Sequence, residues 1–201
     1  MDFRPLNSAD IKKTIQYAID GMHFHIYFQS DFMTWMYGKY FFYSETLRAT
    51  QQIAAYDGDH LLGILIAHID GEPRQGRSFR MAAYVWMFEA ISRIFFRGSA
   101  GEYSAACDDM LESYLASNAR DGEIVFLAAD PNCGRKGIGT ALLGELARRE
   151  KGKTITLFTD DQCSFSFYEH RGFRLMEERN IVLKLKKPIP LRCMLYAKTL
   201  E

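Results

Sequence analysis

The sequence is short of the features that mark several protein classes. Its 4 cysteines show no Cys-x-x-Cys spacing, so we expect reduced thiols, with no zinc site and no disulfide framework. Lys+Arg and Asp+Glu balance at 25 each, and without a basic excess we expect no nucleic-acid partner. No apolar run approaches the roughly 18 residues of a membrane span, and the first residues do not resemble a secretory signal. We therefore expect a cytoplasmic protein without a membrane partner.

One strand–loop–helix stretch, residues 127–143, stands out from this background. The apolar run 124–129 predicts a buried strand, which Pro131 ends because proline cannot donate to a ladder. Three glycines follow closely: Gly134, Gly137 and Gly139. The next apolar residues recur at helical spacing: Ile138, Leu142 and Leu146. A glycine loop that opens a helix presents unpaired N–H groups to a phosphate, and Arg135 and Lys136 add positive charge there.

The glycines alone leave the phosphate ligand open. A Walker loop requires a lysine before its Ser/Thr, but Gly139 directly precedes Thr140, so ATP is not expected. A Rossmann loop requires a third glycine where Leu142 stands. A strand–turn–helix that binds no ligand is the remaining alternative.

A second motif follows further along the chain. Residues 154–158 are β-branched and apolar, which predicts a strand, and segment 164–173 comes after it. Together the two motifs resemble those of the GNAT acyltransferase superfamily. The family's first motif is a strand ending near proline, then Arg/Gln-x-x-Gly-x-Gly/Ala, then a helix. Its second is Asn-x-x-Ala-x-x-Phe-Tyr-x-x-x-Gly-Phe, which Phe167, Tyr168, Gly172 and Phe173 match. The departures are Gly134 for Arg/Gln, Asp161 for Asn and Ser164 for Ala.

The resemblance implies an α+β, three-layer α/β/α fold. Its central sheet is mixed, mostly antiparallel and flanked by helices. We expect a single domain over residues 1–201. Residues 72–122 depart from the family as a helical insertion between the third and fourth strands, with helices expected at 79–96 and 103–119 over one sheet face, either as a lid or as plain structure.

The resemblance also implies acetyl-CoA as co-substrate and an amine as acceptor, in direct transfer without a metal. The residues expected to bind acetyl-CoA are Leu127, Ala128, Ala129, Gly134, Arg135, Lys136, Gly137, Ile138, Gly139, Thr140, Asp161, Ser164 and Tyr168. Tyr168 corresponds to a family phenol near sulfur, where it would donate to the leaving thiolate. Asp130 lies where some members carry the general base, although a turn role or a water chain would serve equally.

Two other hypotheses remain open from the sequence. A GNAT-like module could hold acyl-CoA without turnover, and a thiol enzyme could use Cys163 or Cys133. The aromatic segment 23–43 forms either core or the wall of an acceptor pocket. Its His23 and His25 lack the third ligand that a metal site requires. A monomer or a homodimer would be consistent with the sequence.

Short local patterns predict the remaining elements. A helix is expected from Asn7 or Ser8 to Gly21. Asp-Gly at 57–58 predicts a hairpin between strands 52–56 and 61–69, with a bulge at Gly63. Further strands are expected at 174–178, 181–185 and 193–196, and the basic run 184–187 is expected to protect a solvated sheet edge.

Overall fold

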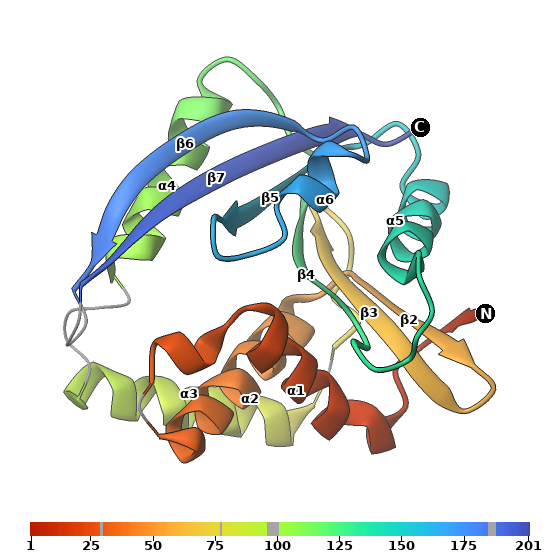
Figure 1. The fold of residues 1–201 in the computed structure, drawn as a ribbon, viewed down its shortest axis with the longest axis horizontal. Helices are drawn as coiled ribbons and strands as arrows, with labels where there is room; N and C mark the ends of the chain where they lie inside the picture. Colours follow the sequence, from red (N-terminus) through yellow and green to blue (C-terminus); the bar gives the residue numbers. More distant parts are fainter. Residues whose placement is uncertain (29, 77, 96–100, 185–187) are drawn as a thin grey trace.

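The computed structural model describes residues 1–28, 30–76, 78–95, 101–184 and 188–201. One 7-stranded sheet runs through it in the order β1-β2-β3-β4-β5-β7-β6 (Figure 1). The strands are β1 (Asp2–Arg4), β2 (Gln51–Asp57), β3 (His60–Ile69), β4 (Gly122–Ala129), β5 (Thr154–Asp160), β6 (Arg174–Leu183) and β7 (Ile189–Thr199). Only β4 and β5 pair in parallel, and every other neighbouring pair in the described sheet is antiparallel. The predicted mixed, mostly antiparallel sheet is confirmed.

Helices cover both faces of this sheet. On one face lie α1 (Ile11–Gly21), α2 (Asp31–Arg48) and α4 (Gly101–Leu115), with two short 3-10 turns, η1 (Ser8–Asp10) and η2 (Phe24–Ile26). On the other face lie α5 (Ile138–Arg149) and the short α6 (Ser166–Glu169). The alternation along β7 explains the division, because Cys193 and Leu195 pack toward α4 while Met194 and Tyr196 pack into the core under α5. The α/β/α layering is therefore confirmed.

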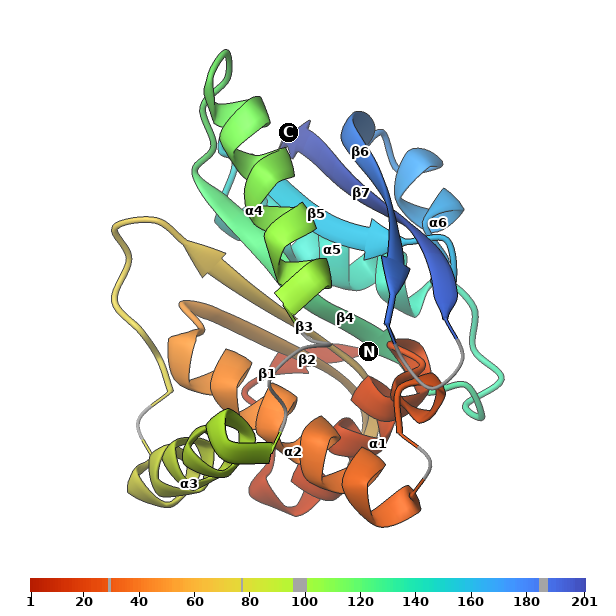
Figure 2. The same cartoon turned by 90° about the vertical axis from the view of Figure 1, so that its left-hand side faces the viewer.

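The insertion between β3 and β4 contains α3 (Phe79–Phe95) and α4, as the helical spacing predicts. The two helices differ in what they cover. Helix α4 packs on β6 and β7 through Met110 and Tyr114, and Figure 2 shows it beside these strands. Helix α3 packs on α2 instead, with Phe88 stacked on Tyr40 at 4.4 Å between ring centroids. The expectation that both helices cover the sheet is thus wrong for α3, whose aromatic side chains find partners on α2.

A local irregularity in β4 positions the site. Ile66 pairs with Phe126 and Ala67 with Ile124, so Val125 is an extra residue that forms a β-bulge. The parallel pairing of β4 with β5 extends only through Gly122↔Ile155 and Glu123↔Thr156. Beyond this point the two strands diverge, and one edge of β4 keeps backbone groups that no neighbouring strand pairs. An extended ligand can bind along such an edge as an additional strand would.

Local predictions succeed where the pattern is short-range. The hairpin at 57–60 is confirmed, and Gly58 has a φ of 57°. Gly63 lies beside the β2–β3 bulge, and an added Cβ there would lie 2.7 Å from the Ala128 carbonyl oxygen, so close packing on β4 is what requires glycine. Strands 174–178 and 181–185 prove to be one strand, β6. The expected end of the first insertion helix at residue 96 and most of the basic run 184–187 lie outside the described residues.

Candidate active site

The loop between β4 and α5 forms an open cradle at a helix N-terminus. Gly134 and Gly137 adopt left-handed backbone conformations, with φ of 64° and 83°, and a Cβ added to either would meet nothing within 4 Å. Gly137 is the N-cap of α5, and its carbonyl accepts the Ala141 N–H at 2.9 Å. The N–H groups of the first turn, from Ile138 onward, precede the hydrogen-bonded helix and point out of it. Buried Ile138 anchors this turn in the core.

A second cation joins the cradle from elsewhere in the sequence. Arg171, which follows α6, donates from Nε and Nη2 to the Thr140 hydroxyl at 2.8 and 2.6 Å. Its guanidinium lies 3.7 Å from the centroid of the Phe167 ring, which fixes its position. Arg171 lies within the second sequence motif, but nothing in that motif indicates that this side chain contacts α5. Arg135 is less available, because its guanidinium lies 3.3 Å from Asp57, and the Lys136 side chain is exposed.

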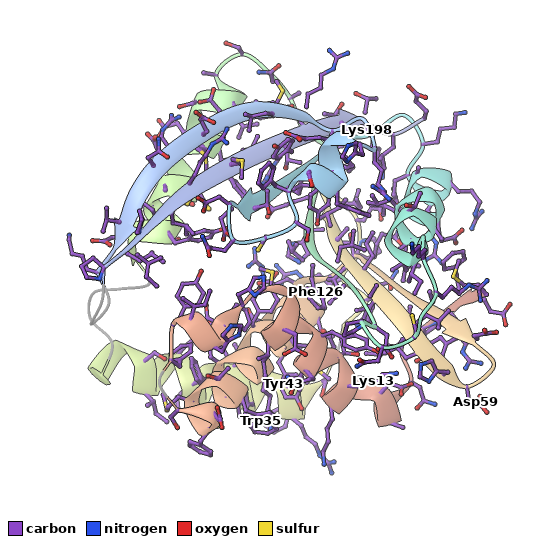
Figure 3. All side chains as sticks on the ribbon, viewed as in Figure 1. Lys13, Trp35, Tyr43, Asp59, Phe126 and Lys198 are labelled. Carbon is purple, nitrogen blue, oxygen red and sulfur yellow. The ribbon has the colours of Figure 1, made fainter. Side chains whose placement is uncertain are left out.

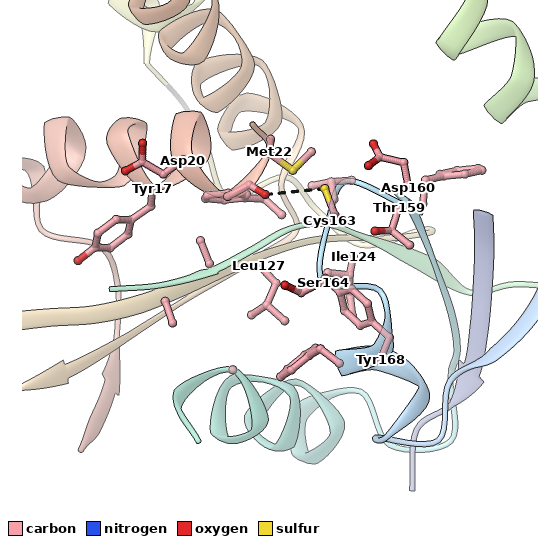
Figure 4. A pocket seen from close by; sticks show the side chains of 18 of the residues that line it. Tyr17, Asp20, Met22, Ile124, Leu127, Thr159, Asp160, Cys163, Ser164 and Tyr168 are labelled. Carbon is pink, nitrogen blue, oxygen red and sulfur yellow. Dashed lines mark hydrogen bonds between the residues drawn. The ribbon is translucent and has the colours of Figure 1, made fainter. Parts of the chain in front are cut away.

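The divergence of β4 and β5 opens a cavity of about 420 Å³ (Figure 4). Residues 124–129 of β4 form one wall, and the end of β5 with the following loop forms the other. Leu127, Ala128, Ala129, Gly139, Ser164 and Tyr168, all predicted site residues, line it together. Its lining extends from Gly139 in the first turn of α5 to the gap between the strands.

Tyr168 lies on the α5 side of this cavity. Its ring packs edge-on against Phe167 and Phe173, with centroid distances of 5.2 and 5.8 Å. Burial raises the pKa of its hydroxyl above the usual value, and nearby Cys163 adds to this shift. Within the described chain the hydroxyl has no hydrogen-bond partner, so it is free to donate to a ligand in the cavity.

Cys163 faces the same cavity, but its environment does not activate it. Burial raises the pKa of its thiol to about 12, with the neighbouring Asp160 carboxylate next in importance. Its Sγ donates to the Gly21 carbonyl at 3.8 Å, as the dashed line in Figure 4 marks. A thiol with such a pKa holds almost no thiolate at neutral pH, which argues against the thiol-enzyme hypothesis for Cys163.

Asp130 occupies a structural position instead of facing the cavity. Its side chain is 5% exposed and lies 2.8 Å from the Lys13 ammonium and 3.3 Å from His60 Nε2. Its Oδ1 also accepts the Asn132 N–H at 2.9 Å, which closes the turn around Pro131. Burial alone would raise the pKa of this carboxyl, but the hydrogen bonds from Lys13, Asn132 and Tyr17 outweigh it and hold the pKa well below the usual value. A carboxylate held so strongly is a poor proton acceptor, and we therefore replace the suggested base role of Asp130 with this structural one.

The Lys13–Asp130 pair predicts a pH-dependent stability. Since the folded pKa of Asp130 is depressed, its stabilisation is present above the unfolded pKa of about 3.9 and is lost as the pH falls toward the folded value. We expect Asp130→Asn to lower the free energy of unfolding by about 1–3 kcal/mol near pH 7, and by a smaller amount near pH 2, which is closer to the folded pKa of Asp130. Denaturant unfolding at both pH values measures this. Asp57→Asn, which removes an exposed partner of Arg135, is the control and should change stability by at most about 0.5 kcal/mol. Equal losses at both pH values would contradict the electrostatic account.

The two aspartates at the end of β5 point in different directions. Asp161, the predicted ligand contact, is exposed, and its Oδ1 accepts the Arg192 N–H of β7 at 3.2 Å. It does not line the cavity. Asp160, which the sequence reasoning passed over, is buried and does line it. The cause is the period of two along a strand, which sends neighbouring side chains to opposite sides.

The residues that the structure describes also bear on two other classes of site. Among these residues, no group of three or more His, Cys, Asp or Glu side chains is arranged to hold a metal ion. No helix in the described part of the chain is both long and apolar enough to cross a membrane.

Comparison with known proteins assigns this architecture to a class. Residues 22–173 match the Acetyltransferase (GNAT) family, and the chain belongs to it. No curated protein matches the sequence.

Solved structures with the same fold are distant in sequence. A Drosophila melanogaster polyamine N-acetyltransferase, which forms N-acetylagmatine, shares 11% identity at a TM-score of 0.62, with 99% of each chain covered. The PaiA N-acetyltransferase of Thermoplasma acidophilum, solved with coenzyme A, shares 16% identity at 0.53, with 98% of each chain covered. Arabidopsis thaliana NAA60, solved with a bisubstrate analogue, shares 12% at 0.52, covering 98% of this chain and 96% of that one. At these identities the likeness concerns the fold.

Proposed function

We propose that this protein is an N-acetyltransferase that moves the acetyl group of acetyl-CoA to a primary amine, by direct attack within a ternary complex. The observation that carries the proposal is that the cavity between β4 and β5 is lined by Gly139 of the first α5 turn and shares four lining residues with a second cavity lined by aromatic residues. In this arrangement acetyl-CoA would bind with its phosphates at the α5 N-terminus and its extended chain in the first cavity. The amine would bind in the second cavity, and the two substrates would meet where the cavities share residues.

In this proposal the cradle binds the pyrophosphate of acetyl-CoA. The open Cβ positions of Gly134 and Gly137 leave room for phosphate oxygens beside the first N–H groups of α5. Arg171, Lys136 and Thr140 add charge and a hydroxyl at the same end. The unpaired edge at 127–129 offers strand-like hydrogen bonds to the pantetheine amides, and a backbone N–H near Ala129 polarises the thioester carbonyl. Acetyl-CoA supply is consistent with a cytoplasmic setting.

The aromatic chamber in this proposal receives the acceptor. Segment 23–43 contributes five of its six aromatic lining residues, Phe24, Tyr27, Phe28, Tyr37 and Phe41, while α4 contributes the sixth, Tyr103. The two helices of the insertion therefore have different roles. Helix α4 lines the chamber, whereas α3 packs on the outer side of α2. Figure 3 shows labelled Phe126 of β4 between the sheet and the α1–α2 layer, and Trp35 and Tyr43 further out on α2.

Turnover separates this proposal from a module that only holds acyl-CoA. We expect the purified protein to release CoA thiol from acetyl-CoA when a suitable primary amine is added, and to release almost none without it. A thiol-release assay over a panel of amines, with mass spectrometry of the acetylated product, measures this. Tight acetyl-CoA binding without amine-dependent release across the panel would favour the binding module and refute the enzyme.

A further inference from the structure

The two cavities meet at a small group of shared residues. The aromatic chamber has a volume of about 210 Å³ and shares Met22, Tyr103, Asp160 and Cys163 with the larger cavity. These four come from three separate parts of the fold: the turn after α1, the first turn of α4 and the end of β5. A group in this junction reaches both substrates of a two-substrate reaction.

Asp160 is the charged member of this junction, and it is 6% exposed. Its Oδ1 accepts the Gln162 N–H at 2.9 Å. Other buried carboxylates have a cation beside them, since Asp130 lies 2.8 Å from Lys13 and Glu150 lies 2.7 Å from Lys153. Among the residues that the structure describes, Asp160 forms no ion pair. A buried carboxylate without a cation is destabilising, and such a group favours a cationic ligand.

The groups that face Asp160 do not supply the missing charge. Tyr27 lies after η2, Tyr103 on α4, Cys193 on β7, and Cys163 and Asp161 in the following loop. Burial raises the pKa of both phenols, and it raises the pKa of each thiol to about 12, so all four are neutral at physiological pH. Burial also raises the pKa of Asp160 itself, and the adjacent Asp161 adds to that shift. A raised pKa makes Asp160 a better proton acceptor than an ordinary aspartate.

We propose that Asp160 binds the ammonium group of the acceptor amine and takes its proton, while an aromatic or similarly apolar body of the amine fills the chamber beyond. This inference rests on the proposed acetyl transfer and names the acceptor class for that same site. In Figure 4, Asp160 lies with Met22 on the α1 side of β4, and Tyr168 lies on the opposite side with α5. Asp160 therefore lies on the side of the gap where the acceptor amine would bind, and Tyr168 lies on the side where the thioester sulfur would be.

The chamber limits the size and charge of that body. A cavity of roughly 150 Å³ is enough for one benzene ring, so about 210 Å³ suits one ring with a short linker. Its lining contains six aromatic residues: Phe24, Tyr27, Phe28, Tyr37, Phe41 and Tyr103. Asp160 is the one acid among the described residues of that lining, so a diamine would bury its second ammonium without a carboxylate partner there. The acceptor class is therefore an arylalkyl monoamine, not a polyamine.

The reaction moves two protons and one acetyl group. The ammonium gives one proton to the Asp160 carboxylate, and the neutral amine nitrogen then attacks the thioester carbonyl carbon. The new C–N bond forms as the C–S bond breaks, and the electron pair of that bond leaves on sulfur. The attacking nitrogen loses its second proton, which ends on the sulfur as the thiol. Asp160 releases the first proton to solvent after the product leaves.

The test compares the wild type with Asp160→Asn, which keeps an oxygen for the Gln162 N–H and removes the charge. With 2-phenylethylamine as acceptor, we expect kcat/KM to fall by roughly 30–1,000-fold, since a buried charge pair loses one partner. The pH profile should change as well. In the wild type kcat/KM falls on the acid side when Asp160 is protonated, whereas the variant depends on free amine and rises tenfold per pH unit toward the amine pKa near 10. Asp59→Asn, at the exposed hairpin tip in Figure 3, is the control and should match the wild type in both respects.

Thermal unfolding gives a readout that does not depend on turnover. Without ligand, Asp160→Asn should unfold about 2–4 °C above the wild type, because the variant no longer buries an unpaired charge. Saturating 2-phenylethylamine should raise the unfolding temperature of the wild type and leave that of the variant unchanged. Putrescine should not raise the unfolding temperature of either protein. A wild-type pH profile and kcat/KM in Asp160→Asn, or preference for putrescine, would overturn this inference while leaving acetyl transfer intact. Absence of amine-dependent thiol release in the wild type would instead refute the proposed function, and the unfolding shifts would still decide whether Asp160 binds the amine.

Discussion

Replacement of Gly137 by valine is expected to weaken acetyl-CoA binding by roughly 100-fold or more. Gly137 has a φ of 83° at the N-cap of α5, a conformation that β-branched residues adopt only with strain of about 1–3 kcal/mol. The added side chain projects into the open cradle where the pyrophosphate is proposed to lie. Each N–H that no longer reaches a charged phosphate oxygen loses a hydrogen bond that contributes about 1.5–3 kcal/mol to binding. Calorimetric titration with acetyl-CoA measures the loss.

The chain provides a matched control for this substitution. Gly152, between α5 and β5, also has a φ of 83°, and its Cβ would likewise meet nothing within 4 Å. Gly152→Val therefore introduces comparable backbone strain away from the cradle, and we expect reduced stability with unchanged acetyl-CoA affinity. Gly139 is less suitable, because an added Cβ would lie 2.8 Å from the Phe167 ring and would displace α6. Wild-type affinity in a folded Gly137→Val variant would show that the cradle does not bind the nucleotide end.

Much of the fold was predictable because its signals are local. The Asp-Gly hairpin, the helical spacing after Gly137 and the apolar run of β4 each depend on a few neighbouring residues. The family resemblance then supplied the order of these elements. Helix α3 shows the limit, since its apolar composition predicted burial, whereas in the described residues the helix packs mainly on α2 and leaves Trp86 72% exposed. Composition predicts how apolar a helix is, but its partner depends on contacts distant in sequence.

The site was predictable along one segment and not across segments. Residues 127–129 and Gly139 lie in one motif, and they line one cavity together. Arg171 reaches Thr140 only because α6 lies beside α5, and no spacing in the sequence indicates that contact. The choice between Asp160 and Asp161 depends on where β5 ends, since a shift of one residue reverses which side chain faces the cavity. Sequence reasoning chose Asp161 from the family pattern and therefore missed the buried neighbour.

Tyr168 is the second position at which a large effect is expected. Its hydroxyl lies in the cavity without a partner among the described residues, on the side opposite Asp160 (Figure 4). A thiol titrates near 8.5 and tyrosine ordinarily near 10, so full proton transfer to a departing thiolate is already uphill by about 2 kcal/mol. Burial raises the pKa of Tyr168 further, which widens that gap. The environment therefore favours a hydrogen bond to the forming thiolate over complete proton donation.

The expected effect of Tyr168→Phe follows from this distinction. Loss of a hydrogen bond to a charged sulfur, about 1.5–3 kcal/mol, predicts a fall in kcat of roughly 10–150-fold with little change in acetyl-CoA affinity. If Tyr168 were a true general acid, its loss would instead lower kcat by up to about 10⁴-fold. The matched control is Tyr114→Phe, another buried tyrosine, whose hydroxyl donates to the Ala119 carbonyl at 3.2 Å, away from the cavity. That variant should lose about 1 kcal/mol of stability and keep its kcat. Steady-state kinetics at saturating acetyl-CoA and amine distinguish these cases. An unchanged kcat in Tyr168→Phe would show that the phenol takes no part in the chemistry. A fall in kcat beyond about 10³-fold would indicate a general acid.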